Sequence, residues 1–247
     1  MNVPFSSGRL WRLGQLEDWH FWFAGRRALI ERLLDRYLRS NGRPALDIGC
    51  GTGWMLNALA PRFGRIVGID LNPDGLHAMR RHDRGAMLMR ANATRLPIAD
   101  NVFGTVLLLD VLEHVDDQAA LAEVHRVLRP NGVAVLSVPA VQWLWSYRDV
   151  AAGHRRRYGR RQLIDAITGA GLSIVAVRYY QCLLFPLVTA GRLLGRRGPR
   201  LRDLEERPSP RLSRALAWVN RTEVRLGETI AWPWGSSLVA VCRKAVT

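Results

Sequence analysis

The sequence predicts an α/β protein with a doubly wound, mostly parallel sheet, and three observations support this prediction. Short apolar runs alternate with stretches in which apolar residues recur every three or four positions, as in amphipathic helices. The run at 45–48 breaks into glycines at alternate positions, which marks a tight strand-to-helix turn. The runs at 65–70 and 103–110 each end in an acidic residue. Strands that alternate with helices form parallel sheets, whose carboxyl ends meet at the edge where ligands bind.

The expected elements follow in order along the chain. Residues 1–27 are aromatic and irregular, and we expect them to cover either the end of the sheet or a bound ligand. Only the second arrangement places Trp22 or Arg26 beside that ligand. Helical periodicity begins at Leu29, and Pro61 ends the helix that follows the glycine turn. The expected strands lie at 45–49, 65–70, 87–91, 103–110, 133–139, 172–179 and 237–244, and the expected helices at 29–38, 54–60, 73–82, 117–128, 160–169 and 210–226.

The glycines at 49, 51 and 53 give the first indication of function. Glycine lets the backbone turn sharply and lets a ligand approach main-chain atoms closely. The start of the next helix then offers unpaired N–H groups to a polar ligand. The spacing Gly-x-Gly-x-Gly differs from the Gly-x-Gly-x-x-Gly of dinucleotide-binding proteins. Taken alone, the turn is also consistent with an ordinary strand-to-helix connection.

Three segments together resemble one family. The run from Asp47 to Gly53 resembles motif I of class I S-adenosylmethionine (SAM)-dependent methyltransferases, and Asp70 resembles the acid that binds the ribose of SAM. The run Asp110-Val-Leu-Glu-His resembles the subgroup that methylates small molecules and lipids, and differs from the motifs of adenine-N6 and cytosine-C5 methyltransferases. Two positions depart from the family pattern, because Asn92 and Gly104 stand where the family usually has acids.

The resemblance implies a Rossmann-like fold with seven strands in the order 3-2-1-4-5-7-6 and helices on both faces. It also implies that SAM is the cofactor, that S-adenosyl-L-homocysteine is the product, and that no metal is needed. Transfer would be an in-line displacement in which a general base is optional. His114 is the first candidate for that base and His154 the second, because histidine titrates near neutral pH. The residues implied to hold the cofactor are Trp22, Asp47, Gly49, Cys50, Gly51, Asp70, Leu71, Asn92, Ala93 and Asp110.

Positive charge is concentrated in the C-terminal part of the chain. Of the net charge of +15, residues 1–150 contribute +3 and residues 151–247 contribute +12. This asymmetry favours an anionic partner. The arginine-rich loop at 153–161 is either a solvated turn or a clamp for an anion. Helix 210–226 either packs on the sheet or lies on a membrane surface, with its apolar side formed by Leu212, Leu216, Val219 and Leu226.

We therefore expect a methyltransferase that acts on a small-molecule or lipid-linked acceptor, with an anionic acceptor favoured. Two alternatives stay open at this stage. One is an RNA-modifying methyltransferase that binds RNA through the basic third of the chain, although no recognisable RNA-binding module is appended. The other is a non-catalytic SAM-binding protein, which the departures at Asn92 and Gly104 allow.

The sequence divides into four expected segments. These are an aromatic lid and helix at 1–40, the SAM-binding core at 41–180, a basic and apolar insertion at 181–236, and the last strand of the sheet at 237–247. The three cysteines are scattered without metal-ligand spacing, which indicates a reduced, intracellular setting. No continuous apolar run follows Met1, and none approaches the roughly 20 residues of a membrane span. We expect a cytoplasmic protein, with peripheral contact at the inner face of the membrane as a further option.

Overall fold

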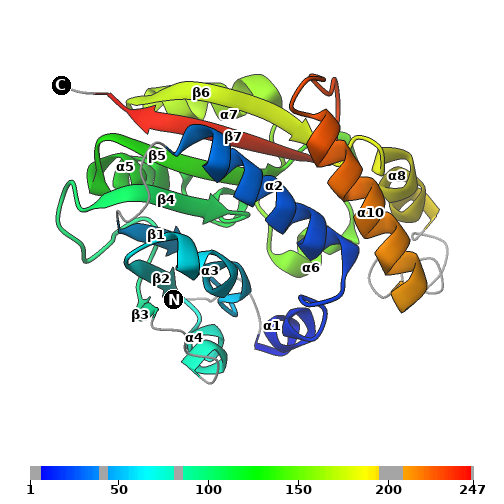
Figure 1. Cartoon of the computed structure of the whole chain (residues 1–247), viewed down its shortest axis with the longest axis horizontal. Helices are drawn as coiled ribbons and strands as arrows, with labels where there is room; N and C mark the ends of the chain where they lie inside the picture. The colour runs from blue at the N-terminus through cyan, green and yellow to red at the C-terminus, as the bar shows by residue number, and fades with distance from the viewer. Residues whose placement is uncertain (1–6, 39–43, 81–85, 195–207, 246–247) are drawn as a thin grey trace.

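The computed structural model describes residues 7–38, 44–80, 86–194 and 208–245. These residues contain a seven-stranded sheet with helices on both faces (Figure 1). The strand order is β3-β2-β1-β4-β5-β7-β6. Neighbouring strands are parallel except at β7, which runs antiparallel to both β5 and β6. The predicted fold class and strand order are therefore confirmed.

The strands are β1 (Ala45–Ile48), β2 (Ile66–Asp70), β3 (Met87–Arg90), β4 (Phe103–Leu109), β5 (Leu128–Pro139), β6 (Leu172–Tyr180) and β7 (Ser237–Lys244). In the described ranges the α-helices are α1 (Ser7–Gly14), α2 (Phe21–Tyr37), α3 (Trp54–Leu59), α4 (Pro73–Arg80), α5 (Asp117–Val127), α6 (Tyr147–Ala152), α7 (Arg160–Gly169), α8 (Phe185–Leu194) and α10 (Pro210–Leu226). Single 3₁₀ turns are η1 (Ala60–Arg62), η2 (Leu112–His114) and η3 (Gln142–Leu144).

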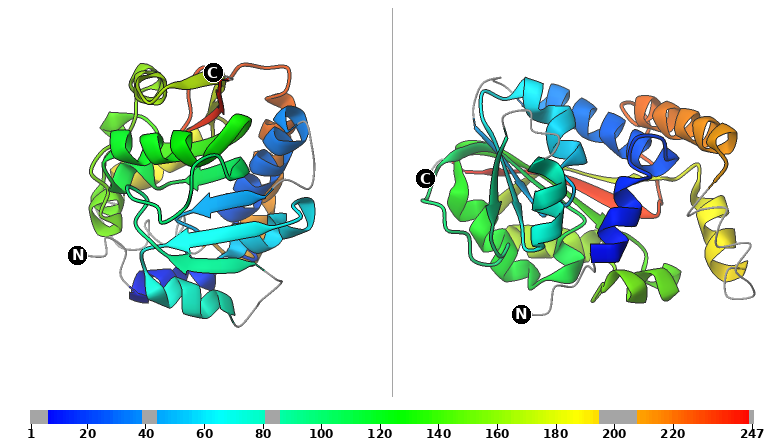
Figure 2. Two further views of the ribbon diagram at one scale, coloured as in Figure 1. Left: turned by 90° about the vertical axis from the view of Figure 1, so that its left-hand side faces the viewer. Right: turned by 90° about the horizontal axis from the view of Figure 1, so that it is seen from below.

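Helices bury the sheet on both faces (Figure 2). One face packs against α5 and α7, and the other packs against α2 and α3. All seven residues of β4 are buried, which explains why its sequence is mainly apolar and does not alternate with exposed polar residues. The buried helical side chains include Leu121, Val124, Leu163 and Ile167 on the first face and Ile30, Leu34, Leu56 and Leu59 on the second.

The prediction that residues 1–27 are irregular is wrong for much of this segment. Helix α1 occupies Ser7–Gly14, and α2 begins at Phe21 rather than near Leu29. The His20 imidazole caps α2 by accepting a hydrogen bond from the Trp22 amide. The first turns of α2 could not be recognised from hydrophobic periodicity, because a glycine, Gly25, occupies a buried position of the helix. A Cβ atom there would lie 2.3 Å from the Tyr180 hydroxyl, so the apolar period is interrupted where the backbone must pack closely.

Helix α10 has the predicted bounds, but its predicted apolar face is only half buried. Leu216 is buried and Val219 packs beside it, whereas Leu212 and Leu226 are exposed. The buried side also contains three polar residues that bond to neighbouring backbone groups, namely Ser213, Asn220 and Glu223. The helix packs against α2, side by side with it in Figure 1. Periodicity assigns polar residues to the solvent side, so it missed these three.

Strand β5 begins at Leu128, earlier than the expected 133, and its pairing with β4 shifts register after this start. Helix α8 was not among the expected helices, because Pro186 interrupts the apolar segment in the sequence. Pro186 lies in the first turn of α8, where its missing N–H has no helical partner. The expected helix stop at 41–44 and the expected end of helix 73–82 lie largely outside the described residues. So does most of the basic connection expected at 192–211. None of the helices in the described ranges combines the length and apolar composition needed to cross a bilayer.

Candidate functional site

A cavity of about 780 Å³ opens at the carboxyl edge of the sheet. This volume is typical of sites for small ligands. We divide its lining into a glycine-loop half (Asp47, Gly49, Gly51, Asp70 and Asn92) and a histidine half (Glu113, His114, Asp149, His154 and Arg157). Every residue that the sequence suggested for the site lines this one cavity, namely Trp22, Asp47, Gly49, Cys50, Gly51, Asp70, Leu71, Asn92, Ala93, Asp110, His114 and His154.

The glycine loop between β1 and α3 has a backbone that only glycine adopts easily. Gly49 and Gly51 have φ angles of 76° and 56°, in the left-handed region. A Cβ atom on Gly49 would lie 2.3 Å from the Val111 side chain, so the loop packs closely against the segment after β4. The loop is thus shaped to present main-chain groups to a ligand.

Asp70 ties the end of β2 to the glycine loop. Its Oδ2 accepts a hydrogen bond from the Gly51 amide at 2.8 Å, and its Oδ1 accepts one from the Asn72 amide at 2.7 Å. Burial raises the pKa of Asp70, and these backbone hydrogen bonds act in the opposite direction. A carboxylate has about four acceptor positions, so both oxygens can also accept from ligand hydroxyls.

Asp47 lies buried at the base of the same half. Burial raises its pKa to about 7, although the nearby Arg26 guanidinium lowers it and the Asp70 carboxylate adds to the rise. A cationic ligand group would stabilise the charged carboxylate here.

Asn92 presents a different group from the one expected. Its Oδ1 already accepts hydrogen bonds from both the amide and the hydroxyl of Thr94, each at 3.0 Å. A ligand in this half therefore meets chiefly the NH₂ group of Asn92, which is a donor.

Arg26 and Asp110 join the N-terminal helix to the carboxyl ends of β4 and β5. The guanidinium lies 2.8 Å from Asp110 Oδ2 and also donates to the Ser137 hydroxyl. It stacks over the Trp22 ring at 4.7 Å, and the Ser137 hydroxyl donates to Asp110. This contact holds Trp22 in the lining of the cavity.

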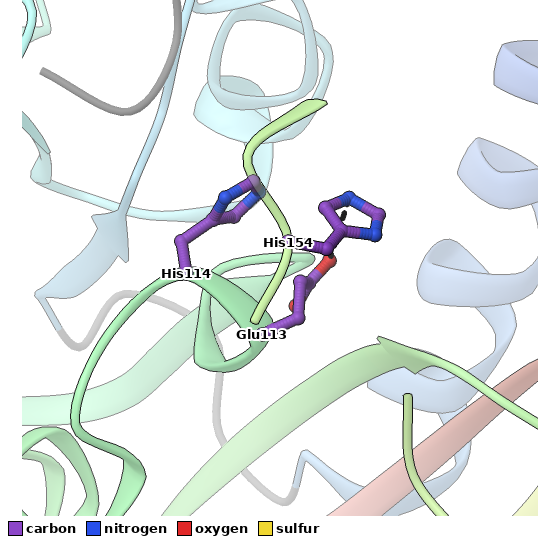
Figure 3. A group of neighbouring side chains, drawn as sticks. All are labelled: Glu113, His114 and His154. Carbon is purple, nitrogen blue, oxygen red and sulfur yellow. Dashed lines mark ion pairs between the residues drawn. The ribbon is translucent and has the colours of Figure 1, made fainter. Parts of the chain in front are cut away.

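The histidine half brings together residues of η2 and of the loop after α6 (Figure 3). The rings of His114 and His154 lie 4.9 Å apart and nearly perpendicular. His154 Nδ1 lies 2.9 Å from Asp149 Oδ1, and its Nε2 lies 4.0 Å from Glu113 Oε1. The two histidines that the sequence suggested separately thus form one group, together with a glutamate to which the sequence analysis assigned no role.

Glu113 is fully buried, and neither carboxylate oxygen has a hydrogen-bond partner among the described residues. Burial raises its pKa well above the usual range, and the charge of Asp110 adds to this. The sequence signal was an acid inside the otherwise apolar run after β4, at a position next to His114.

Asp149 was also missed from the sequence. Burial alone would raise its pKa, but the hydrogen bond to His154 and the charges of Arg157 and Arg192 outweigh burial and lower it. Arg157 Nε donates to Asp149 Oδ1 at 2.8 Å. Arg156, its neighbour in the arginine-rich loop, pairs with Asp117. These two arginines therefore bind carboxylates of the protein itself. This pairing differs from both arrangements that the sequence suggested for the loop, a solvated turn and a clamp for an anion.

Comparison with known proteins finds methyltransferases in sequence and in fold. Residues 46–136 match the model of a methyltransferase domain family. A relative from Mycolicibacterium smegmatis is 28% identical over 64% of this chain and 62% of its own length. One from Mycobacterium tuberculosis is 28% identical over 76% of this chain and 63% of its own. Both are described as probable S-adenosylmethionine-dependent methyltransferases. The chain thus spans less than two thirds of the length of these relatives.

Solved structures show the same fold. Phosphoethanolamine N-methyltransferase 2 of Haemonchus contortus, in complex with SAM, has a TM-score of 0.64 at 16% identity, over 98% of this chain and 58% of that chain. A SAM-dependent methyltransferase of Methanosarcina mazei has a TM-score of 0.58 at 16% identity, over 87% and 98%. Residues 46–136 therefore match a methyltransferase domain, and the chain is similar in sequence to probable SAM-dependent methyltransferases and in fold to solved ones.

Proposed function

We propose that the protein transfers a methyl group from SAM to a small-molecule or lipid-linked acceptor held in the histidine half of the cavity. The observation that carries this proposal is that the glycine loop, Asp70 and two histidines line one continuous cavity. A cofactor site and an acceptor site that share a cavity meet the requirement of direct transfer between two bound molecules.

The glycine-loop half fits SAM by the chemistry of its donors and acceptors. Asp47 is suited to the ammonium of the amino-acid part, because a buried carboxylate gains most from a cationic partner. Asp70 is suited to the ribose hydroxyls through its remaining acceptor positions. When bound, SAM supplies an activated methyl group on its sulfonium. The protein's own contribution is then to align the acceptor and exclude water.

The histidine half is suited to activate an acceptor hydroxyl. The Nδ1 atom of His154 faces the Asp149 carboxylate, so this nitrogen carries the hydrogen and Nε2 carries the lone pair. A base whose second nitrogen is held by a carboxylate is a common arrangement for general-base catalysis. This geometry favours His154 over His114, the reverse of the order that the sequence suggested.

An exposed apolar surface next to the histidine half supports a lipid-linked acceptor. Trp143 and Leu187 are 60% and 45% exposed, and Leu183, just before α8, is exposed as well. The Trp143 ring contacts Phe185 at 5.7 Å, and the same helix, α8, places Arg192 in the cavity lining. Residues 151–247 carry a net charge of +12, which suits an anionic membrane surface, and the exposed apolar side chains would contact its lipids where a lipid-linked acceptor enters.

Calorimetric titration with S-adenosylhomocysteine tests the cofactor site. We expect micromolar binding by the wild type and loss of binding in Asp70→Ala. A folded wild-type protein that does not bind would overturn the proposed function. For the acceptor, we expect co-sedimentation with vesicles containing anionic lipid, reduced at high salt. Equal sedimentation with neutral vesicles would remove the membrane-surface part of the proposal.

A further inference from the structure

Glu113, His114 and His154 form a cluster with the composition of a metal site. One potential ligand atom from each residue lies within 4.8 Å of the other two. Glu113 and His114 come from η2, and His154 comes from the loop after α6, so two separate segments build the cluster (Figure 3). The cluster borders the cavity described above.

Both imidazoles are held as metal-binding histidines usually are. His154 Nδ1 lies 2.9 Å from the Asp149 carboxylate, and His114 Nδ1 lies 3.3 Å from the Gly153 carbonyl oxygen. Each of these oxygens can only accept, so each Nδ1 donates a hydrogen and Nε2 is the nitrogen that would bind a cation. An oxygen acceptor on the other ring nitrogen is the typical support for a histidine that binds a metal.

The Glu113 carboxylate lacks a partner that its burial requires. Its side chain is 1% exposed, and neither oxygen has a hydrogen-bond partner in the described part of the chain. A buried carboxylate without hydrogen bonds is strongly unfavourable. A bound cation would supply the missing interaction.

We propose that Glu113, His114 and His154 bind a divalent transition-metal cation. Two imidazoles and one carboxylate suit Zn²⁺, Mn²⁺ or Fe²⁺ and leave at least one coordination position open. His154 Nε2 and Glu113 Oε1 are 4.0 Å apart. Two ligands of one Zn²⁺ ion lie about 3.4 Å apart, so small side-chain rotations close the site.

The metal site differs from the expectation that no metal is needed, and its role rests on the proposed methyl transfer. The open position would bind the oxygen of the acceptor hydroxyl. A cation lowers the pKa of a bound hydroxyl, whose proton then passes to solvent. Activation would thus come from the metal, with both histidines serving as ligands instead of as bases.

The test measures metal binding directly, without SAM or an acceptor. Tag-free protein is stripped with a chelator and titrated with ZnCl₂ by calorimetry. We expect one Zn²⁺ per chain in the wild type, and dissociation constants raised about 100-fold in Glu113→Gln and in His154→Ala. His125→Ala, which removes a histidine outside the cluster, serves as the matched control and binds as the wild type does.

Two further measurements distinguish a failed metal site from a misfolded variant and from a failed cofactor site. Zn²⁺ is expected to raise the melting temperature of the wild type but not of Glu113→Gln, which checks that the variant folds. Wild-type protein that binds less than one Zn²⁺, or variants that bind as tightly as the wild type, would overturn the metal site. Titration of the metal-free protein with S-adenosylhomocysteine runs in parallel. Its success alongside failed Zn²⁺ binding would reject the metal and leave the cofactor site standing.

Discussion

The Arg26 guanidinium lies 2.8 Å from Asp110 Oδ2, and this ion pair joins helix α2 to the end of strand β4. Asp110 has a left-handed backbone with φ of 54°, which turns the chain at the edge of the sheet. The side chains of Arg26 and Asp110 are 14% and 24% exposed, so water screens the pair only partly. The pair therefore couples the position of the N-terminal segment to the shape of the cavity.

Removing Arg26 is expected to destabilise the protein. Among the described residues, Arg26→Met leaves the Asp110 carboxylate with the Ser137 hydroxyl, and the lost charge-assisted hydrogen bonds are worth about 1–3 kcal/mol in the free energy of unfolding. Urea denaturation measures the change. The control is Arg27→Met, because the pair of Arg27 with Glu31 is exposed and contributes little. Equal stabilities of the two variants would contradict a structural role for the Arg26 pair.

Replacing Asp70 by asparagine is expected to weaken S-adenosylhomocysteine binding about 10- to 100-fold. The substitution puts an NH₂ donor where the Gly51 or Asn72 amide now donates, so one loop contact becomes a clash of two donors. Calorimetry measures the affinity, and Asp74→Asn, an exposed change in the first turn of α4, is the control. Unchanged binding in Asp70→Asn would show that this carboxylate is dispensable.

Cofactor affinity is expected to fall as the pH drops through neutrality. Burial raises the pKa of Asp47 to about 7, so the carboxylate is charged above this pH and protonated below it. An ammonium group prefers the charged form, and the dissociation constant should rise by up to tenfold per pH unit below about pH 7. Titrations at several pH values test this. Asp47→Asn should bind weakly with a flat profile, and a flat profile in the wild type would refute the assignment.

Alanine is expected to act oppositely at two helical glycines. In Gly25→Ala the new Cβ would lie 2.3 Å from the Tyr180 hydroxyl and 2.6 Å from the Asn220 side chain, so α2 and α10 must separate. Overpacking of this kind costs about 1–3 kcal/mol in the free energy of unfolding. Gly8→Ala meets no atom within 4 Å, and the gain in helix propensity stabilises by up to about 1 kcal/mol. Thermal unfolding of both variants checks the opposite signs.

The sheet was predictable because its signals are local. Strands such as β1 and β4 are buried on both faces, so each appears as a mainly apolar run between turn residues. The glycine loop and Asp70 carry their own short-range pattern, and the resemblance then placed them at one edge. These features can be recognised in the sequence without any knowledge of tertiary contacts.

The residues that the sequence did not reveal are those defined by contacts between distant segments. Glu113 gains a role only because the loop after α6 lies against η2 and brings His154 to it. Asp149 of α6 likewise meets Arg192 of α8. The inward side of α10 carries Ser213 and Asn220 because the N-terminal segment supplies their partners. Hydrophobic periodicity contains no information about such polar contacts.

The packing of α2 against α10 makes two ends of the chain into one cooperative unit. The Phe21 amide donates to the Ser213 hydroxyl at 2.8 Å, and the Phe21 carbonyl accepts from Asn220 at 3.1 Å. An amide bonded in this way exchanges its hydrogen with solvent only when the local structure opens. The segment that carries Trp22 and Arg26 to the cavity can therefore move away only when α10 also loosens. Opening of this kind belongs to the microsecond-to-second range of local unfolding rather than to fast loop motion.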